Sequence, residues 1–270
     1  MTDPRSAIPE DQGWASAFTF DLRDGRDVLA VPDTYARNAT IVYRGVANLN
    51  WSLDTALYRR VSRSRRQPAG EAEVASEERE LLDGARRLRL DRRDGFEMTD
   101  LELLAVLQHQ GAATRLLDVS FNAMISLWFA TEDRTQDDYD AGLFAFDVTG
   151  RELPPEREDD PIADLIAEPS FHLWRPPPVE VRIRAQQGAF IFGRVPDPVP
   201  AQTCLDLGID RWLDPEPAPS PSATNRPPFG VFRIPAEAKP RLREFLDRLL
   251  GYNAETLYPD LAGYAQARRA

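Results

Sequence analysis

The stretch Leu107-Gln-His-Gln-Gly-Ala-Ala-Thr-Arg-Leu-Leu-Asp-Val-Ser-Phe-Asn-Ala-Met-Ile-Ser-Leu-Trp-Phe-Ala130 sets polar side chains directly against an apolar segment. Residues 109–122 hold one of the chain's two histidines together with a glycine, an arginine, an aspartate and a serine. Polar groups this close to a buried element destabilise a fold unless they are hydrogen-bonded or paired. The stretch is therefore either a structural network or a functional site.

The sequence around this stretch predicts a mixture of helices and strands. Thr99-Asp-Leu-Glu102 is typical of a capping box in front of a helix over 103–108. Asn122 or Ser120 is expected to cap an apolar helix over 121–131. Further helices are expected within 51–60, at 71–90 and at 239–250. Strands are expected at 39–43, 114–117, 142–148, 179–184, 186–192 and 229–234.

These elements predict a single α+β domain, with helices grouped in the first half of the chain. A chain of 270 residues can bury a sizeable core. We expect the domain to span residues 39–265, with residues 1–38 as an N-terminal lead-in packed on it. Residues 149–178 are charged and Pro-rich and are expected to be mostly loop. The Pro-rich segment 196–228 is expected to be a surface excursion.

Composition narrows the expected partners and location. The net charge is −11 and the pI about 4.8, which argues against binding nucleic acid through bulk electrostatics. Cys204 is the only cysteine, so no intramolecular disulfide is expected. No apolar run approaches the ~20 residues that span a bilayer, and the N-terminus lacks the pattern of a secretory signal. We therefore expect a cytoplasmic protein with no membrane partner.

One local exception to the acidic balance is the segment Arg59-Arg60-Val-Ser-Arg63-Ser-Arg65-Arg66. Its five arginines are typical of a solvated loop or helix end, but they could also bind phosphate or hold RNA locally. Lys239 is the only lysine in the chain, so nearly all of the positive charge is arginine. Both interpretations of the arginine run remain open.

The standard catalytic signatures are absent from the sequence: there is no GxGxxG, GxxxxGK[ST], HExxH, CxxC or GxSxG motif. One cysteine and the two histidines, His109 and His172, are too few for an ordinary zinc site, so no metal is expected. His109, Asp118 and Ser120 could form a catalytic triad. However, no nucleophile-elbow sequence surrounds Ser120.

Tyr43-Arg44-Gly45 lies at the end of the first predicted strand and is a candidate anion site. The arginine fork donates two parallel charge-assisted hydrogen bonds, which suits a diphosphate. The neighbouring glycine would let a ligand approach the backbone. The alternative is that Arg44 is buried against an acidic partner such as Asp118 for a purely structural reason.

Two further groups of residues are open to the same pair of interpretations. His109, Gly111, Thr114, Arg115, Asp118 and Ser120 form either a hydrogen-bonded knot or the floor of a pocket. In the first case Asp118 pairs with Arg115 or Arg44. In the second, the N-terminus of the 121–131 helix would offer N–H groups to an anion. The late hairpin at 179–192 contains Gln186 and Gln187, and Glu180 is its only acid.

Four of these segments together resemble the FRG domain family, named for its Phe/Tyr-Arg-Gly motif. They are Tyr43-Arg44-Gly45 with the residues that follow it, Leu107 to Ala130, Gln186-Gln187-Gly188-Ala-Phe190, and Thr256-Leu-Tyr-Pro-Asp-Leu-Ala-Gly263. They occur in the family's order over roughly residues 39–265. The chain is therefore identified as a member of the FRG domain family.

The FRG pattern is in turn similar to that of the Arg-Ser-Glu class of ADP-ribosyltransferases, which implies a mixed or antiparallel split sheet and NAD as substrate. The resemblance implies catalytic roles for His109, Ser120, Glu180 and Gln187. It implies NAD-binding roles for Tyr43, Arg44, Gly45, Gln108, Gly111, Thr114, Arg115 and Asp118. Where those transferases have a catalytic glutamate, this chain has Gln186-Gln187. Glu180 or Glu255 would have to replace that carboxylate.

The resemblance leads to one main functional hypothesis and two alternatives. The main hypothesis is an NAD-dependent ADP-ribosyltransferase-like effector, a toxin or phage-defence protein. It would act on a protein or RNA target and have a cognate antitoxin or defence-system partner. The first alternative is a catalytically inactive FRG module that binds a nucleotide, a nucleic acid or a protein. The second is nucleotide or RNA cleavage with His109 as the general acid–base.

Overall fold

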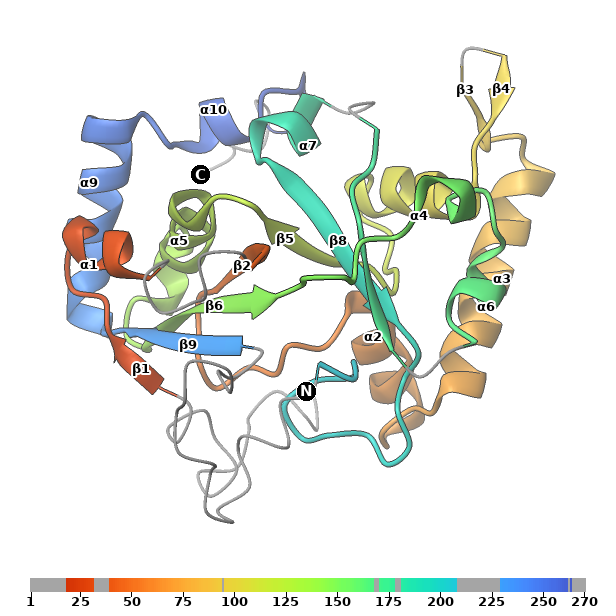
Figure 1. Ribbon diagram of the computed structural model, residues 1–270, viewed down its shortest axis with the longest axis horizontal. Coiled ribbons are helices and arrows are strands. Elements are labelled where there is room, and N and C mark those ends of the chain that lie inside the picture. Colours follow the sequence, from red (N-terminus) through yellow and green to blue (C-terminus); the bar gives the residue numbers. More distant parts are fainter. Residues whose placement is uncertain are drawn as a thin grey trace.

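The computed structural model describes residues 18–31, 39–93, 95–167, 170–177, 181–207, 229–261 and 263. Within these residues the main feature is a mixed sheet in the order β1-β9-β6-β2-β5-β8-β7 (Figure 1). β1 and β9 are parallel, and the other neighbouring strands of this sheet are antiparallel. The expected α+β class with a mixed sheet is confirmed.

The strands of this sheet are β1 (Phe18–Asp21), β2 (Ile41–Val46), β5 (Leu117–Ser120), β6 (Ala141–Asp147), β7 (Phe171–Trp174), β8 (Gly188–Gly193) and β9 (Phe229–Ile234). A separate hairpin consists of β3 (Arg92–Arg93) and β4 (Phe96–Glu97). The helices are α1 (Gly25–Ala30), α2 (Ala56–Arg65), α3 (Glu71–Arg87), α4 (Asp100–His109), α5 (Ala123–Thr131), α6 (Ile162–Leu165), α7 (Val181–Ala185), α9 (Lys239–Leu250) and α10 (Ala254–Leu257).

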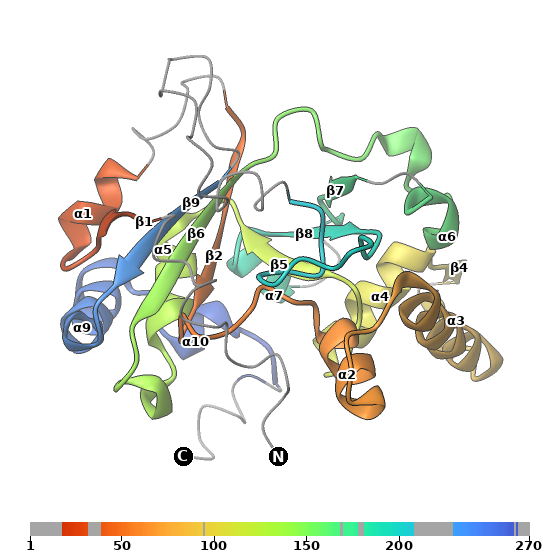
Figure 2. The same cartoon turned by 90° about the horizontal axis from the view of Figure 1, so that it is seen from below.

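Side chains alternate across the strands and build different cores on the two faces of the sheet. On one face, a continuous core runs from Val42 of β2 through Val119 of β5 to Ile191 of β8, and α2 covers it. The opposite face carries two separate cores. One packs α5 and α9 against β6 and β9, and the other packs α4 and α6 against β7 and β8. Figure 2 shows these helices at the two ends of the sheet.

The sheet is nearly divided between β2 and β5. Their ladder consists of a single residue pair, Tyr43 with Ser120, whereas β2 and β6 pair from Ile41 to Val46. Beyond that pair the two strands diverge. On the face with two separate cores, the boundary between those cores falls at the same place, between β2 and the β5–β8–β7 side of the sheet.

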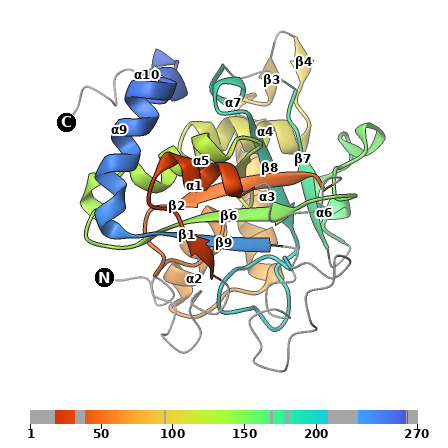
Figure 3. The same ribbon diagram turned by 60° about the vertical axis from the view of Figure 1, so that its left-hand side comes forward.

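Local sequence signals explain the helix ends close to this gap. Thr99 and Glu102 form the predicted capping box of α4, which ends at His109. Asn122 caps α5 by accepting hydrogen bonds from the backbone N–H groups of Met124 and Ile125. The N-terminal region contributes β1 and α1, and α1 packs beside α9 (Figure 3). The rest of the lead-in lies outside the described residues.

Two predicted strands are wrong. The prediction at 179–184 fails because residues 181–185 form α7, and both edges of β8 are already paired with β5 and β7. The predicted strand at 114–117 begins only at Leu117. The Thr114 carbonyl instead accepts a hydrogen bond from Leu57 of α2, and Arg115 turns into a buried ion-pair cluster.

Two predicted loop regions contain more structure than expected. Residues 149–178 include α6 and β7, and β7 takes the place beside β8 that the 179–184 segment was expected to fill. In the segment 196–228, residues 202–205 are buried, and the Leu53 N–H donates to the Gln202 carbonyl. Residues 208–228 lie outside the described part of the chain.

Candidate functional site

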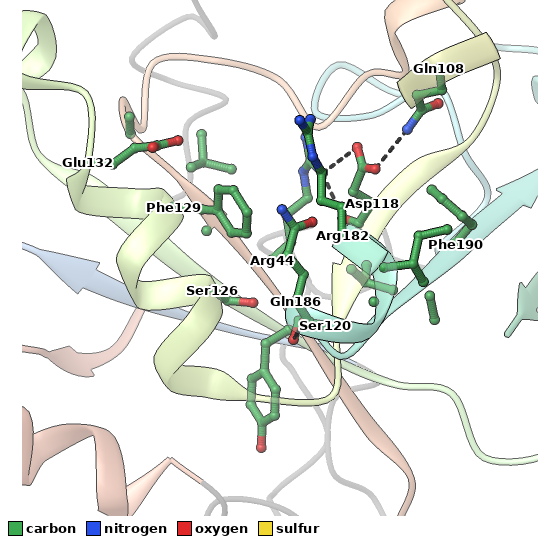
Figure 4. Close-up of a pocket in the computed structure, with 18 of the residues that line it drawn as sticks. Arg44, Gln108, Asp118, Ser120, Ser126, Phe129, Glu132, Arg182, Gln186 and Phe190 are labelled. Carbon is green, nitrogen blue, oxygen red and sulfur yellow. Dashed lines mark hydrogen bonds and ion pairs between the residues drawn. The ribbon is translucent and has the colours of Figure 1, made fainter. Parts of the chain in front are cut away.

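A cavity of about 870 Å³ lies where β2 and β5 diverge. Residues of α2 line it from one face of the sheet, and residues of α5 and α7 line it from the other. Figure 4 shows Glu132 and Phe129 on the α5 side, with Gln108 and Asp118 across from them. The near-division of the sheet therefore creates a site open to both layers of helices.

Arg44 stands in the gap between the strands. Its Nη1 atom donates a hydrogen bond of 2.6 Å to the Asp118 carbonyl oxygen and lies 3.8 Å from the Asp118 carboxylate. Within the described chain, its buried Nε atom has no hydrogen-bond partner. Burial lowers the pKa of the Arg44 guanidinium, the Asp118 carboxylate opposes this shift, and the nearby Arg59 adds to it. Arginine remains charged all the same, so the cavity contains a cation that is incompletely satisfied.

Asp118 belongs to a short polar chain along the edge of the cavity. Its carboxylate accepts a hydrogen bond of 2.8 Å from the Gln108 side-chain amide, and the Gln108 oxygen accepts one from the Thr114 hydroxyl. The Asp118 side chain is 67% exposed. The predicted alternative of an Arg44–Asp118 contact is therefore present, but it is an open contact at the cavity rather than a closed buried pair.

Gly45 has a packing role that the sequence analysis did not predict. A Cβ atom at this position would lie 1.8 Å from the Ser126 carbonyl oxygen and 2.7 Å from the Ala130 nitrogen. The glycine thus allows α5 to lie directly on β2, next to Arg44. Gly45 also lines the cavity, and the expectation that it lets a ligand approach the backbone stays a prediction.

Ser120 and the start of α5 are engaged in internal hydrogen bonds. The Ser120 hydroxyl donates to the Gln186 carbonyl at 2.7 Å and accepts from the Asn122 N–H at 3.0 Å. The backbone N–H groups of Met124 and Ile125 donate to the Asn122 side chain, so these two groups of the helix start are already engaged. Ser120 lines the cavity, and its hydroxyl ties β5 to the turn before β8.

The C-terminal residue Tyr258 lines the same cavity, and Asp260 contacts two of the residues that line it. The Asp260 carboxylate makes a bidentate ion pair with Arg182 of α7 and lies 3.5 Å from the His109 Nε2 atom. The Arg182 hydrogen bond lowers the pKa of Asp260 more than the backbone N–H of Gly263 and the nearby His109 do. Arg182 also lies over the Tyr258 ring, 4.7 Å from its centroid. His109 is therefore held at the edge of the cavity by the fourth sequence motif.

Glu132 is a cavity residue that the sequence analysis missed. It follows the last turn of α5 and accepts a hydrogen bond of 3.3 Å from the Tyr258 hydroxyl. Burial raises the pKa of Glu132 to about 7; Asp133 adds to the shift and the Tyr258 hydrogen bond opposes it. Burial also raises the pKa of Tyr258. The sequence carried no signal for Glu132, because an acid after an apolar helix is ordinary.

The structure brings seven of the twelve predicted site residues together around the cavity: Tyr43, Arg44, Gly45, Gln108, His109, Asp118 and Ser120. Thr114 contacts the site only through Gln108. Gly111 follows the C-terminal end of α4 and has a φ of +93°, and Gln187 has a φ of +47° in the turn after α7. Neither lines the cavity, whereas Gln186 does. Glu180 lies outside the described residues.

Arg115 is buried away from the cavity. Its guanidinium bonds both Glu78 oxygens at 2.8 Å, the Glu71 carboxylate and the Gly193 carbonyl. Arg115 was predicted to contact NAD. Its donors are instead occupied by α3 and β8, so the arginine of the Thr-Arg-Leu-Leu-Asp motif serves the fold.

The arginine run divides between two faces of α2. Arg59 and Arg63, four residues apart, line the cavity. Arg60 and Arg65 instead form ion pairs with Glu77 and Glu73 of α3. The spacing of Arg59 and Arg63 was the one sequence signal that could have selected the cavity arginines from the run.

Neither a metal site nor a membrane span is found in the described residues. Among them, no group of three or more His, Cys, Asp or Glu side chains is placed to hold a metal ion. In the same residues, no helix has the length and apolar character needed to cross a membrane.

Comparison with known proteins identifies part of this architecture. Residues 39–139 match the model of the FRG domain, so the chain contains an FRG domain. The matched region supplies β2 and the helices α2, α4 and α5 around the cavity, whereas Arg182 and Tyr258 lie beyond it. Neither the comparison with curated proteins nor that with solved structures found a match.

Proposed function

We propose that the cavity binds NAD and that the FRG domain is an ADP-ribosyltransferase-like enzyme. The observation that carries this proposal is the side chain of Arg44. Arg44 lines the cavity, and its Nε atom is buried without a hydrogen-bond partner in the described chain. An unsatisfied buried donor on a charged group is costly, and an anionic ligand would remove that cost. A diphosphate is the anion whose geometry best fits the arginine fork.

The distribution of side chains in the cavity supports a dinucleotide rather than a simple anion. Arg59 and Arg63 lie on the α2 side and add positive charge to that of Arg44. Phe129 and Tyr258 line the opposite side and add aromatic side chains to the cavity wall. NAD combines a diphosphate with two planar bases, and a cavity of about 870 Å³ is within the range for a ligand of this size.

The chemistry proposed is transfer of ADP-ribose from NAD to a nucleophile. The bond between ribose C1′ and the nicotinamide nitrogen breaks, and both electrons leave with neutral nicotinamide. Positive charge develops on the ribose, as in glycoside cleavage generally. An enzyme of this kind modifies the cell's own protein or RNA unless it is restrained. We therefore extend the proposal to a cytoplasmic toxin or phage-defence effector with a cognate antitoxin or defence-system partner.

A catalytically inactive nucleotide-binding module is the second candidate. Gln186 lines the cavity near the position where the transferases carry a glutamate, and an amide supplies a dipole without charge. The Ser120 hydroxyl is also engaged by the Gln186 carbonyl and the Asn122 N–H. Such a module would bind NAD or a related nucleotide without releasing nicotinamide.

The test measures NAD binding by calorimetry and nicotinamide release by chromatography on the purified full-length chain. We expect Arg44→Met to weaken NAD binding by about 10- to 100-fold, the effect of losing charged hydrogen bonds. The matched control is Arg60→Ala, because Arg60 pairs with Glu77 away from the cavity. A folded wild-type protein that does not bind NAD at millimolar concentration would overturn the proposal. Binding without nicotinamide release would support the inactive module.

A further inference from the structure

Glu132 is placed unusually for a carboxylate. It lies at the C-terminal end of α5, where the helix dipole disfavours negative charge. Among the described residues it has no ion pair within 4 Å, and its one side-chain hydrogen bond comes from Tyr258. Figure 4 shows it beside Phe129 in the wall of the cavity. A half-buried carboxylate without a cation destabilises the fold, and such groups concentrate at functional sites.

The surroundings of Glu132 are aromatic. The Tyr258 ring packs edge-on against Trp128, with centroids 5.7 Å apart, and against Phe129 at 6.2 Å. Burial in this cluster raises the pKa of Glu132 to about 7. A carboxyl group with that pKa exchanges protons readily near neutral pH, as a general base must.

We propose that Glu132 is the catalytic carboxylate of this cavity, acting at the ribose C1′ of NAD in place of the glutamate that is missing at Gln186-Gln187. The inference rests on the proposed function, since it assigns a residue to the same reaction. It is carried by the position of Glu132 in the cavity that contains Arg44 and by its lack of a cation in the described chain. Glu180 and Glu255 are then not needed for this role.

The step balances without any further reactant. The C1′–nitrogen bond breaks and nicotinamide leaves with the electron pair, while the Glu132 carboxylate stabilises the positive charge on the ribose. The hydroxyl oxygen of the acceptor, or a water molecule, then bonds to C1′. Its proton passes to a Glu132 oxygen. No atom is oxidised or reduced.

Tyr258 acts on this step through Glu132 as a positioning residue. Its hydroxyl donates to the carboxylate, which favours the charged form and lowers the Glu132 pKa. Removing this hydroxyl raises the Glu132 pKa, so a higher pH is needed to ionise the group. The effect on the pH profile distinguishes this role from a purely structural one.

The first experiment compares NAD binding and nicotinamide release for wild type and Glu132→Gln in the full-length chain. We expect the variant to bind NAD within about threefold of wild type and to release nicotinamide about 10²- to 10⁴-fold more slowly. The matched control is Glu97→Gln, an exposed acid on the β3–β4 hairpin, which should match wild type in both assays. The thermal unfolding midpoint of each variant establishes that it is folded.

The outcomes separate the two proposals. A wild-type chain that turns over NAD, with Glu132→Gln keeping its rate within about threefold, overturns the role of Glu132 alone. A wild-type chain that releases no nicotinamide overturns the transferase proposal, and the role of Glu132 with it.

In the second experiment, wild-type turnover should rise between about pH 6 and pH 8, and Tyr258→Phe should shift that rise to higher pH. A wild-type rate independent of pH over this range would also contradict the assignment.

Discussion

Arg44 and Arg115 belong to neighbouring parts of the same sequence pattern, yet they occupy opposite kinds of environment. Arg115 is 2% exposed, and its three nitrogen atoms bond Glu78, Glu71 and the Gly193 carbonyl. Arg44 bonds one backbone carbonyl, and within the described chain its Nε atom has no partner. One arginine is completely satisfied by the fold, whereas the other is satisfied only in part.

An arginine whose hydrogen bonds are all made within the fold has a structural role, whereas one with unused donors can bind a ligand. The place of the arginine in a sequence motif does not decide between these roles. The two carboxylates Glu78 and Glu132 repeat the contrast. Glu78 is buried against Arg115, whereas Glu132 is half-buried against a neutral tyrosine. The closed cluster around Arg115 should therefore govern stability, and the open groups at the cavity should govern ligand chemistry.

The largest expected effect is that of Arg115→Met. The substitution leaves Glu78 buried without its cation, which should lower the free energy of unfolding by about 3–5 kcal/mol. Urea denaturation measures the loss. The double variant Arg115→Met, Glu78→Met removes both charges and should recover much of it. A loss below about 1 kcal/mol would show that the cluster is not the stability centre described here.

The next effect is a pH dependence that Glu132 adds to stability. Because the folded-state pKa of about 7 exceeds the usual value of 4.5, the protonated form is favoured in the folded protein. Its contribution is complete below about pH 4.5, declines as the pH rises, and is lost above about pH 7. Across that range wild type should lose up to about 3 kcal/mol relative to Glu132→Gln. Parallel pH profiles for the two proteins would contradict this.

A smaller effect on stability is expected for Arg44→Met. Its guanidinium makes few contacts and lies at the cavity, so the free energy of unfolding should fall by about 1 kcal/mol or less. Urea denaturation alongside Arg115→Met tests the comparison directly. Equal losses for the two variants would remove the distinction between a closed and an open arginine.

The smallest effect is expected for Arg60→Ala. Arg60 forms an exposed ion pair with Glu77, and such pairs contribute about 0–1 kcal/mol. NAD affinity should be unchanged in this variant, whereas Arg63→Ala should weaken it because Arg63 lines the cavity. Calorimetry on the two variants tests whether the two faces of α2 differ in function. Similar losses of affinity would indicate that the whole run acts as a diffuse charge.

Local signals predicted much of the fold. Apolar runs located β6 and β9, and the capping residues Thr99 and Asn122 marked the starts of α4 and α5. The strand predicted at 179–184 is wrong, because strand formation depends on a free sheet edge and both edges of β8 are occupied. An alternating pattern shows that a segment is able to pair, but the rest of the chain decides whether a partner is available.

The candidate site was predicted in part. The first two motifs indicated Arg44, His109 and Asp118, which all line the cavity. The pattern could not separate Arg115 from Arg44, because the partners that distinguish them come from α3 and β8. Glu132 and Tyr258 are 126 positions apart, and only the folded chain brings them together.

The single pair between Tyr43 and Ser120 also has a mechanical consequence. Strands joined by many residue pairs resist rotation against each other. A single residue pair restrains such rotation much less. On one face of the sheet, a single hydrophobic core spans both sides of this pair. A ligand bound both to Arg44 on β2 and to groups beyond β5 would restrict the motion of the two strands relative to each other. Amide hydrogen exchange along the facing edges of β2 and β5 would then slow when the cavity is filled.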